Sequence, residues 1–375
     1  MCSQPIPFNR ISFDSGELER VQQAIENLHI SGDGPFSKEA EKLLSDMHGG
    51  AKVLLTPSCS HGLELAARLL QFEDGDEVIV PSFTFVTSVS SFVSHGATPV
   101  FCDIDPKTLG LDLEHAKTLI TSRTKAIVLV HYGGVPANPE GFAQLADENN
   151  LVLIEDNAHG LGGNSGGKTL GTFGAMSTLS FHETKNITCG EGGALVINDP
   201  RYIERAEILR EKGTDRSRFF RGQVDKYTWQ DLGSSWILSD ILAAILCAQL
   251  SNFDEIQQRR EERSNRYFEH LRDWAYAHGF GLQPPKLGTS HLFYLLLADL
   301  AGQQRFIDHM SEHGILTVFH YQPLHQSPFV ATLKKADSVL PVTESVSKRL
   351  VRLPLSNSLS EHDQLRVIEK TLKYI

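Results

Sequence analysis

Seven short apolar runs between residues 50 and 200 constrain the fold of this chain more than any other feature. They are rich in Val and Ile, and stretches with helical periodicity separate them. Near-continuous apolar runs are typical of strands covered on both faces, so they predict a largely parallel sheet between two layers of helices. The fold class is therefore α/β. The predicted strands span residues 52–55, 77–80, 98–104, 126–130, 151–155, 176–181 and 194–197.

The chain has 375 residues, more than one hydrophobic core usually supports. After a long charged helix at 254–278, we expect a compact unit of a strand (291–298), a helix (303–313), a strand (315–319) and two terminal helices. We therefore predict a large α/β domain at 1–250, including the N-terminal segment, and a smaller α+β domain at 251–375.

Composition argues against several classes of partner. The formal net charge is −11, from 46 acidic residues against 35 Lys and Arg, and no basic run is present, so nucleic acid is not an expected partner. No stretch approaches the roughly 20 apolar residues that cross a membrane. The five cysteines form no CxxC pair, which indicates reduced thiols and a cytoplasmic protein.

Three polar segments follow predicted strands, where ligands bind in open parallel sheets. The segment "TPSCSHG" (56–62) opens a helix, and its serines are either ordinary caps or part of a phosphate seat. The segment "LVLIEDNAHG" (151–160) ends a strand with Glu155 and Asp156, which are either solvated acids or acids that face a positive partner. The third segment is "LSFHETKN" (179–186).

Metal and dinucleotide sites fit this sequence poorly. The zinc pattern HExxH would need a histidine at 186, where the chain has Asn186. The glycines between 160 and 167 do not form GxGxxG and follow the fifth strand instead of the first. His309 and His313 have helical spacing for a shared metal but no third ligand nearby, so we predict no metal site.

Together the three segments meet the needs of pyridoxal 5'-phosphate. A lysine, Lys185, can form the Schiff base, and an acid, Asp156, can keep the pyridine nitrogen protonated. The helix start between Ser58 and His61 can hold the phosphate.

The motifs resemble the DegT/DnrJ/EryC1/StrS family of sugar aminotransferases, pyridoxal phosphate enzymes of fold type I (aspartate aminotransferase-like). The resemblance covers essentially the whole chain, in the segments "SGDGPFS", "LLTPSCSHGLELA", "GDEVIVPSFTFVTS", "LVLIEDNAHG", "GKTLGTFG", "LSFHETKNITCGEGGALVIND" and "VFHYQPLH". It implies a homodimer in which each partner completes the other's site. The implied cofactor contacts are Lys185 for the Schiff base, Asp156 for the pyridinium, Ser60, Ser180 and the His61 backbone for the phosphate, Phe85 for ring stacking, and His159 for the ring hydroxyl.

One segment departs from the family. Many members carry Gly-x-Asn-x-Arg where this chain has "GSSWI", so Ser235 replaces the asparagine that reaches the partner's cofactor and Ile237 replaces the arginine. A carboxylate or diphosphate would then need another cation. The substrate-binding candidates are Arg216, Arg218 and Arg221, which alternatively form a solvated basic loop, and His320 and Tyr321 of "VFHYQPLH".

The stretches "SFHETKN", "REKGTDRSRFFRGQVDKYTW" and "DLGSSW" are similar to those of family members that aminate a 4-keto sugar. This resemblance implies amino transfer from L-glutamate to the 4-keto carbon of dTDP-4-keto-6-deoxyglucose. The product would be dTDP-4-amino-4,6-dideoxygalactose or its gluco epimer, and 2-oxoglutarate would be released. A 3-keto sugar aminotransferase, a non-catalytic pyridoxal phosphate protein and an oxidoreductase with an unusual nucleotide loop are the alternatives. A sugar dehydratase of this family would carry histidine in place of Lys185. The sequence assigns no role to His182 or Glu183.

Overall fold

A seven-stranded sheet forms the centre of the computed structural model, which describes residues 4–285, 288–333 and 338–374. The strands are, in spatial order, β1 (Lys52–Thr56), β9 (Gly193–Ile197), β8 (Met176–Ser180), β5 (Val152–Asp156), β4 (Thr124–Val130), β2 (Glu77–Pro81) and β3 (Thr98–Cys102). The pairs from β8 to β3 are parallel, whereas β9 runs antiparallel to both of its neighbours. The predicted α/β class and all seven strands are confirmed, with ends that differ by at most two residues.

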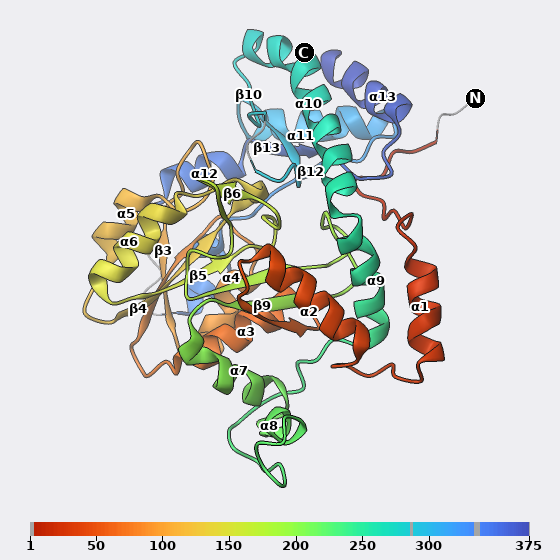
Figure 1. The fold of residues 1–375 in the computed structure, drawn as a ribbon. Helices are drawn as coiled ribbons and strands as arrows, with labels where there is room; N and C mark the ends of the chain where they lie inside the picture. Colours follow the sequence, from red (N-terminus) through yellow and green to blue (C-terminus); the bar gives the residue numbers. More distant parts are fainter. Residues whose placement is uncertain (1–3, 286–287, 334–337, 375) are drawn as a thin grey trace.

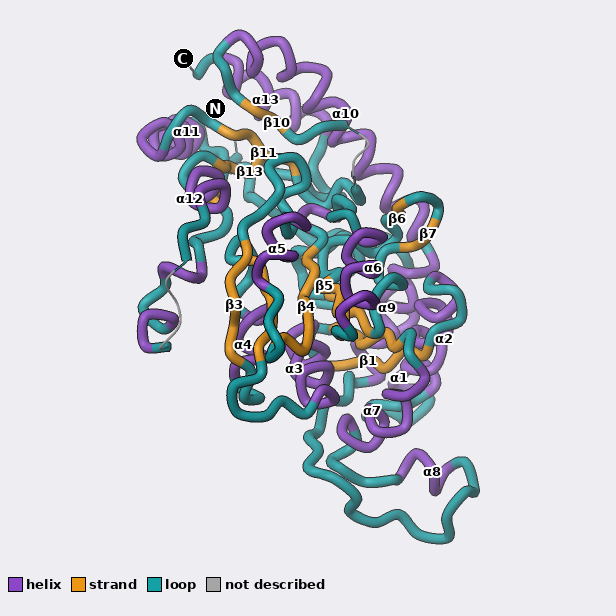
Figure 2. The backbone as a smooth tube through the Cα atoms, turned by 90° about the vertical axis from the view of Figure 1, so that its left-hand side faces the viewer, coloured by secondary structure: helices purple, strands orange, loops and turns teal. Residues whose placement is uncertain are grey.

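The apolar runs arise because both faces of the sheet are buried. In β4, Ala126 and Val128 belong to one core, and Ile127 and Leu129 belong to another on the opposite face. Helices cover both faces (Figures 1 and 2). One face packs against α3 (Cys59–Leu70), α4 (Thr87–Val93) and α7 (Ile203–Arg210). The other packs against α2 (Pro35–Met47), α5 (Leu113–Leu119), α6 (Pro139–Asn149) and α9 (Asp240–Ser251), and α1 (Glu17–Glu26) lies on α9.

A second, antiparallel sheet forms the smaller part of the molecule. Its strands are, in spatial order, β10 (Gly281–Leu282), β11 (Phe293–Leu296), β13 (Leu350–Leu353) and β12 (Val318–Phe319). Its helices are α10 (Phe253–Ala277), α11 (Leu300–Glu312), α12 (Pro341–Ser347) and α13 (Glu361–Leu372). The expectation of only helices after residue 319 is wrong, because β13 pairs with both β11 and β12 between the last two helices.

The two ends of the chain meet in this smaller part. Ile6 forms a parallel bridge with Ile315 and lies in the core formed by residues of α10, α11 and α13. The N-terminal segment, which we assigned to the large domain, therefore contacts the C-terminal unit. The domain boundary near residue 250 stays a prediction, and it falls in the last turn of α9.

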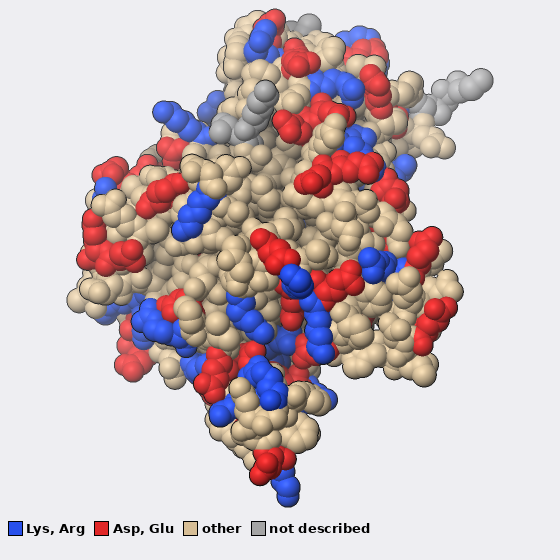
Figure 3. All heavy atoms as spheres, in the orientation of Figure 1, with Lys and Arg blue, Asp and Glu red and all other residues tan. Residues whose placement is uncertain are grey.

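Lys and Arg side chains alternate with Asp and Glu over the face in Figure 3. Cys59, Cys102, Cys189 and Cys247 are free thiols, and Cys2 lies outside the described residues. Among the described helices, none combines the length and the apolar composition that a membrane span requires.

A short hairpin and a short helix lie in two loops of the large domain. The hairpin of β6 (Asn164–Ser165) and β7 (Lys168–Thr169) precedes β8. Helix α8 (Arg216–Phe220) lies in the long loop between α7 and α9, which projects from the large sheet at the bottom of Figure 1.

A buried carboxylate fixes the carboxyl end of β5. Glu155 is fully buried, and its oxygens accept hydrogen bonds from His131 Nε2 at 3.0 Å and from the backbone N–H groups of Gly171, Phe173 and Gly174 at 2.7 to 2.8 Å. Burial raises the pKa of this carboxyl, but the bonds from His131 and the loop amides outweigh burial and leave the pKa below its usual value. Glu155 is therefore a structural acid.

We expect Glu155→Gln to destabilise the fold by about 3 kcal/mol or more, because it removes a buried charge that several donors are arranged to meet. The contribution of Glu155 is present above the unfolded glutamate pKa and is lost as pH falls through the lower folded pKa. Urea unfolding at neutral pH measures the change. Glu148→Gln on the exposed side of α6 is the control and should cost less than about 0.5 kcal/mol. Equal stability of the two variants would contradict this account.

Candidate active site

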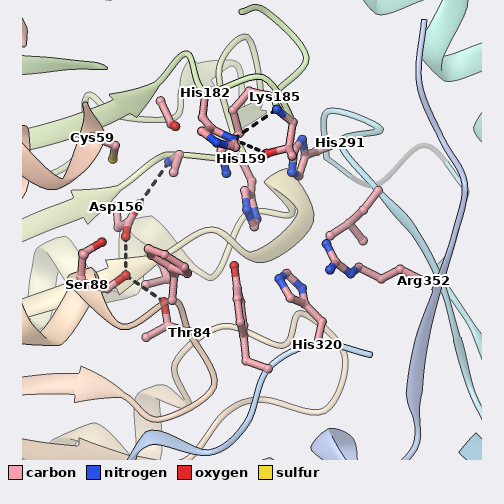
Figure 4. Close-up of a pocket in the computed structure, with 18 of the residues that line it drawn as sticks. Cys59, Thr84, Ser88, Asp156, His159, His182, Lys185, His291, His320 and Arg352 are labelled. Atoms are coloured by element: carbon pink, nitrogen blue, oxygen red, sulfur yellow. Dashed lines mark hydrogen bonds between the residues drawn. The ribbon is translucent and has the colours of Figure 1, made fainter. Parts of the chain in front are cut away.

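A cavity of about 830 Å³ lies at the carboxyl ends of β5 and β8, and the smaller sheet forms its opposite wall (Figure 4). Its lining comes from the start of α3, the loop before α4, the ends of β5 and β8, and residues of β11, β12 and β13 or next to them. The predicted site residues that line it are Ser60, Phe85, Asp156, His159, Ser180, Lys185, His320 and Tyr321.

Asp156, the last residue of β5, is held by a chain of hydroxyl groups. Ser88 Oγ donates to its Oδ2 at 2.6 Å, and the N–H of Ala158 donates to its Oδ1 at 3.2 Å. Because the Ser88 proton is used on Asp156, the Thr84 hydroxyl at 2.9 Å is the donor to Ser88. All three side chains are buried, so the carboxylate is fixed at one wall of the cavity.

Lys185 lies in the turn that follows β8. Its N–H donates to the carbonyl of His182 at 2.9 Å, and the N–H of Thr184 donates to His182 Nδ1 at 3.3 Å. Burial lowers the pKa of the Lys185 amine to about 8, with Arg352 acting in the same direction and Asp156 against it. Cys59 remains a neutral thiol, since burial raises its pKa to about 12. His182 therefore shapes the turn, and roughly a fifth of Lys185 is a neutral amine near pH 7.4, far more than for an ordinary lysine.

Two stacked imidazoles lie beside Lys185, with ring centres 4.2 Å apart. His159 Nδ1 accepts from the N–H of Gly133 at 3.2 Å, so its proton is on Nε2. His291 Nδ1 donates to the oxygen of Asn186 at 2.9 Å, because the amide nitrogen of Asn186 is already donating to the carbonyl of Thr289. Burial, and then nearby positive charge, depress the pKa of both rings well below the usual value. Both histidines are neutral.

The start of α3 meets β9 at a close backbone approach. A Cβ on Gly193 would lie 2.3 Å from the amide nitrogen of Cys59, so only glycine fits there. Ser58 caps the helix and accepts from the N–H of His61 at 3.2 Å. The first turn of a helix presents further amide donors to an anion, and Ser60 and Ser180 add hydroxyl groups at the same wall.

Several predicted residues lie elsewhere. The side chain of His61 contacts Ser58, and His61 is not part of the cavity lining. Ser235 is exposed and forms a backbone bridge with Glu211. The three candidate arginines line no part of this cavity, and each forms an ion pair with a glutamate in α7 or directly after it: Arg216 with Glu211, Arg218 with Glu204 and Arg221 with Glu207.

Sequence reasoning missed four residues of the site, namely Ser88, Asn186, His291 and Arg352. Ser88 and Asn186 lie inside motifs quoted above, but a hydroxyl or amide in a motif carries no signal of its orientation. Arg352 lies in β13 and His291 in the segment before β11, and only the tertiary fold brings them to Lys185.

The arrangement fits pyridoxal 5'-phosphate. A partly neutral lysine amine, a fixed carboxylate and a helix N-terminus line one cavity, and these groups match the aldehyde, the pyridine nitrogen and the phosphate. In the described residues, no cluster of three or more His, Cys, Asp and Glu is placed to hold a metal.

Comparisons with known proteins identify the family to which this chain belongs. Residues 12–372 match the DegT/DnrJ/EryC1/StrS aminotransferase family. The chain is 33% identical to a dTDP-4-dehydro-2,3,6-trideoxy-D-glucose 4-aminotransferase of Saccharopolyspora spinosa, over 96% of this chain and 94% of that protein. Among solved structures, the aminotransferase PseC of Helicobacter pylori, involved in pseudoaminic acid biosynthesis, is similar with a TM-score of 0.91 and 25% identity, and 99% of each chain is covered. The PLP form of Spr1654 from Streptococcus pneumoniae is similar with a TM-score of 0.89 and 26% identity, over 99% of this chain and 100% of that one.

The fold, the lysine cavity and a match over nearly the whole length lead to one conclusion. This chain belongs to the DegT/DnrJ/EryC1/StrS aminotransferase family and is a pyridoxal phosphate-dependent sugar aminotransferase.

Proposed function

We propose that this enzyme transfers the amino group of L-glutamate to the 4-keto carbon of dTDP-4-keto-6-deoxyglucose. The product is dTDP-4-amino-4,6-dideoxygalactose or its gluco epimer, and 2-oxoglutarate leaves. The observation that carries the proposal is the Lys185 amine, which lies in the same cavity as Asp156 and has a pKa near 8. Such an amine is available both as a nucleophile and as a base.

When bound, pyridoxal phosphate supplies an aldehyde that bonds to amines and a ring that takes up the electron pair left when a proton departs from the neighbouring carbon. We assign its covalent attachment to Lys185, its pyridine nitrogen to Asp156 and its phosphate to Ser60, Ser180 and the backbone at His61. Phe85 would stack on the ring, and the Nε2–H of His159 would donate to the ring hydroxyl. Phe85 is 54% exposed, so the ring would bury it.

Lys185 has a second task after the cofactor leaves it. Its freed amine would remove the proton from the α-carbon of the amino donor and later return a proton to the new amine-bearing carbon of the sugar. His159 and His291 are neutral, so they add no positive charge beside this position. His320 and Tyr321 would contact the sugar from the opposite wall.

The 4-keto position is favoured by the relative of Saccharopolyspora spinosa, whose name describes a 4-aminotransferase acting on a dTDP-4-dehydro sugar. A 3-keto sugar is the second candidate. Most residues assigned above would contact the cofactor, and they do not distinguish C3 from C4 of the sugar.

We also propose a cytoplasmic homodimer with shared sites. The loop between α7 and α9 projects from the body of the subunit and exposes Phe220 by 70% and Trp229 by 74%. Large exposed aromatic groups are typical of an interface. Ser235 and the three arginines of this loop would then lie near the partner's site.

The purified enzyme should form 2-oxoglutarate and one amino sugar from L-glutamate and dTDP-4-keto-6-deoxyglucose. Product NMR assigns both the aminated carbon and its configuration. The corresponding 3-keto nucleotide sugar is the comparison substrate. Faster turnover of the 3-keto sugar would replace the proposal by its alternative, and no turnover with either sugar would remove it.

Lys185→Ala should lower steady-state turnover by at least about four orders of magnitude, since one residue provides both the covalent link and the proton transfer. Borohydride treatment followed by mass spectrometry should attach the cofactor to the Lys185 peptide in the wild type and to no peptide in the variant. Lys168→Ala, an exposed lysine of β7, is the matched control and should behave as wild type. Normal turnover by Lys185→Ala would refute the assignment.

Acylation of Lys185 in the cofactor-free protein should show a midpoint near pH 8. Below that pH the amine is protonated and unreactive, whereas an ordinary exposed lysine titrates near about 10.4. Labelling across pH, read by mass spectrometry of the Lys185 peptide, measures the midpoint. Asp156→Asn should move it lower, because Asp156 stabilises the charged amine. A midpoint near that of exposed lysines would contradict the buried position of Lys185.

A further inference from the structure

Arg352 is a cation of the cavity without an acidic partner. It lies in β13 and lines the cavity on the side of the smaller sheet, and its guanidinium extends toward His320 (Figure 4). Within the part of the chain that the structure describes, no carboxylate lies within ion-pair distance of it, and its buried Nε has no hydrogen-bond partner. Most of its donor capacity is therefore unused.

The guanidinium is nevertheless held in place. One terminal nitrogen donates to the carbonyl of Phe319 at 3.4 Å, and the ring of Phe8 lies 4.6 Å from the guanidinium carbon. An aromatic face on one side and a carbonyl at one edge fix the plane of the group. The remaining N–H groups form a fork that suits a carboxylate.

The positive charge of Arg352 affects the pKa of Lys185 and of the histidines around it. It lowers the pKa of Lys185, His159, His291 and His320, which places it close to all four. Burial in turn lowers the pKa of Arg352 itself. Arg352 is half-buried, and its buried Nε has no hydrogen-bond partner in the structure. An unpaired cation in such a position is costly, so the position is suited to an anionic ligand.

We propose that Arg352 binds the α-carboxylate of the amino donor, an inference that rests on the proposed function. In an α-amino acid the carboxylate and the amine share one carbon, so the carboxylate must lie beside the place where Lys185 acts. The diphosphate of a nucleotide sugar is attached across the sugar ring from C4 and extends away from that place. Arg352 is near Lys185, as the carboxylate requires.

The same assignment accounts for the departure from the family pattern. This chain has Ile237 in place of the expected arginine, and Arg216, Arg218 and Arg221 are each paired with a glutamate. Arg352 is contributed by a different element, and it supplies the missing charge within the same subunit.

Arg352→Gln tests the proposal by equilibrium binding in the cofactor-loaded protein, with calorimetry as the readout. We expect the affinities for 2-oxoglutarate and for pyruvate to fall by about 10- to 100-fold, the usual effect of losing hydrogen bonds to a charged group. Affinity for dTDP should stay within about twofold of wild type. Arg352→Lys should retain part of the 2-oxoglutarate affinity, because it keeps the charge but loses the fork.

Arg349→Gln is the matched control. Arg349 lies just before β13 and bonds to the carbonyl of Leu297 outside the cavity, so its replacement should leave all three affinities unchanged. Unchanged keto-acid binding by Arg352→Gln, or a loss confined to dTDP, would overturn the proposal. A loss for 2-oxoglutarate without a loss for pyruvate would assign Arg352 to the distal carboxylate and overturn the α-carboxylate assignment. These binding measurements need no keto sugar. A negative result in the sugar turnover assay would therefore count against the proposed function and not against the role of Arg352.

Discussion

The hydrogen bonds to Glu155 are the interaction on which the catalytic edge of the sheet depends. Successive residues of a strand point to opposite faces, so Glu155 and Asp156 cannot share an environment. Glu155 ties β5 to His131 and to the loop at 171–174, and this leaves Asp156 directed to the other face, where Ser88 holds it. Glu155 therefore has a structural role, and its position determines the side of the sheet on which Asp156 lies.

The second wall of the cavity is set by the smaller sheet. Arg260 of α10 is fully buried and donates to the carbonyls of Ser290 and His291, which positions the segment before β11. Asn186 reaches the same segment through Thr289 and His291. Because Asn186 is the neighbour of Lys185, these bonds link the lysine turn to the smaller sheet. The lysine is thus located by contacts from both parts of the chain.

The sequence predicted the elements whose burial determines their composition. The seven strands of the large sheet were found because burial on both faces makes most of their residues apolar. The cavity was located because polar residues follow three of these strands, β1, β5 and β8. Strand β13 was missed, since four residues with an arginine among three apolar ones show no clear period. Its arginine and His291 could not be assigned for the same reason: their role depends on pairing between segments far apart in the chain. The orientation of Ser88 toward Asp156 is likewise a product of tertiary packing, which local pattern does not encode.

The charged residues of the cavity, Asp156 and Arg352, have opposite effects on the pKa of Lys185. Asp156 lies at the wall of the large sheet, Arg352 lies at the wall of the small sheet, and Lys185 experiences both in opposite directions. Burial lowers the pKa of the lysine amine, and Asp156 keeps it from falling further, so the amine remains near the pH at which it can both take up and release a proton. The neutral histidines between them add hydrogen-bonding groups without adding charge. A ligand with an anionic group near Arg352 would offset the part of the pKa lowering of Lys185 that comes from Arg352, while the larger effect of burial would remain. The bound amino donor would therefore make the lysine a stronger base at the stage when the proton must be removed.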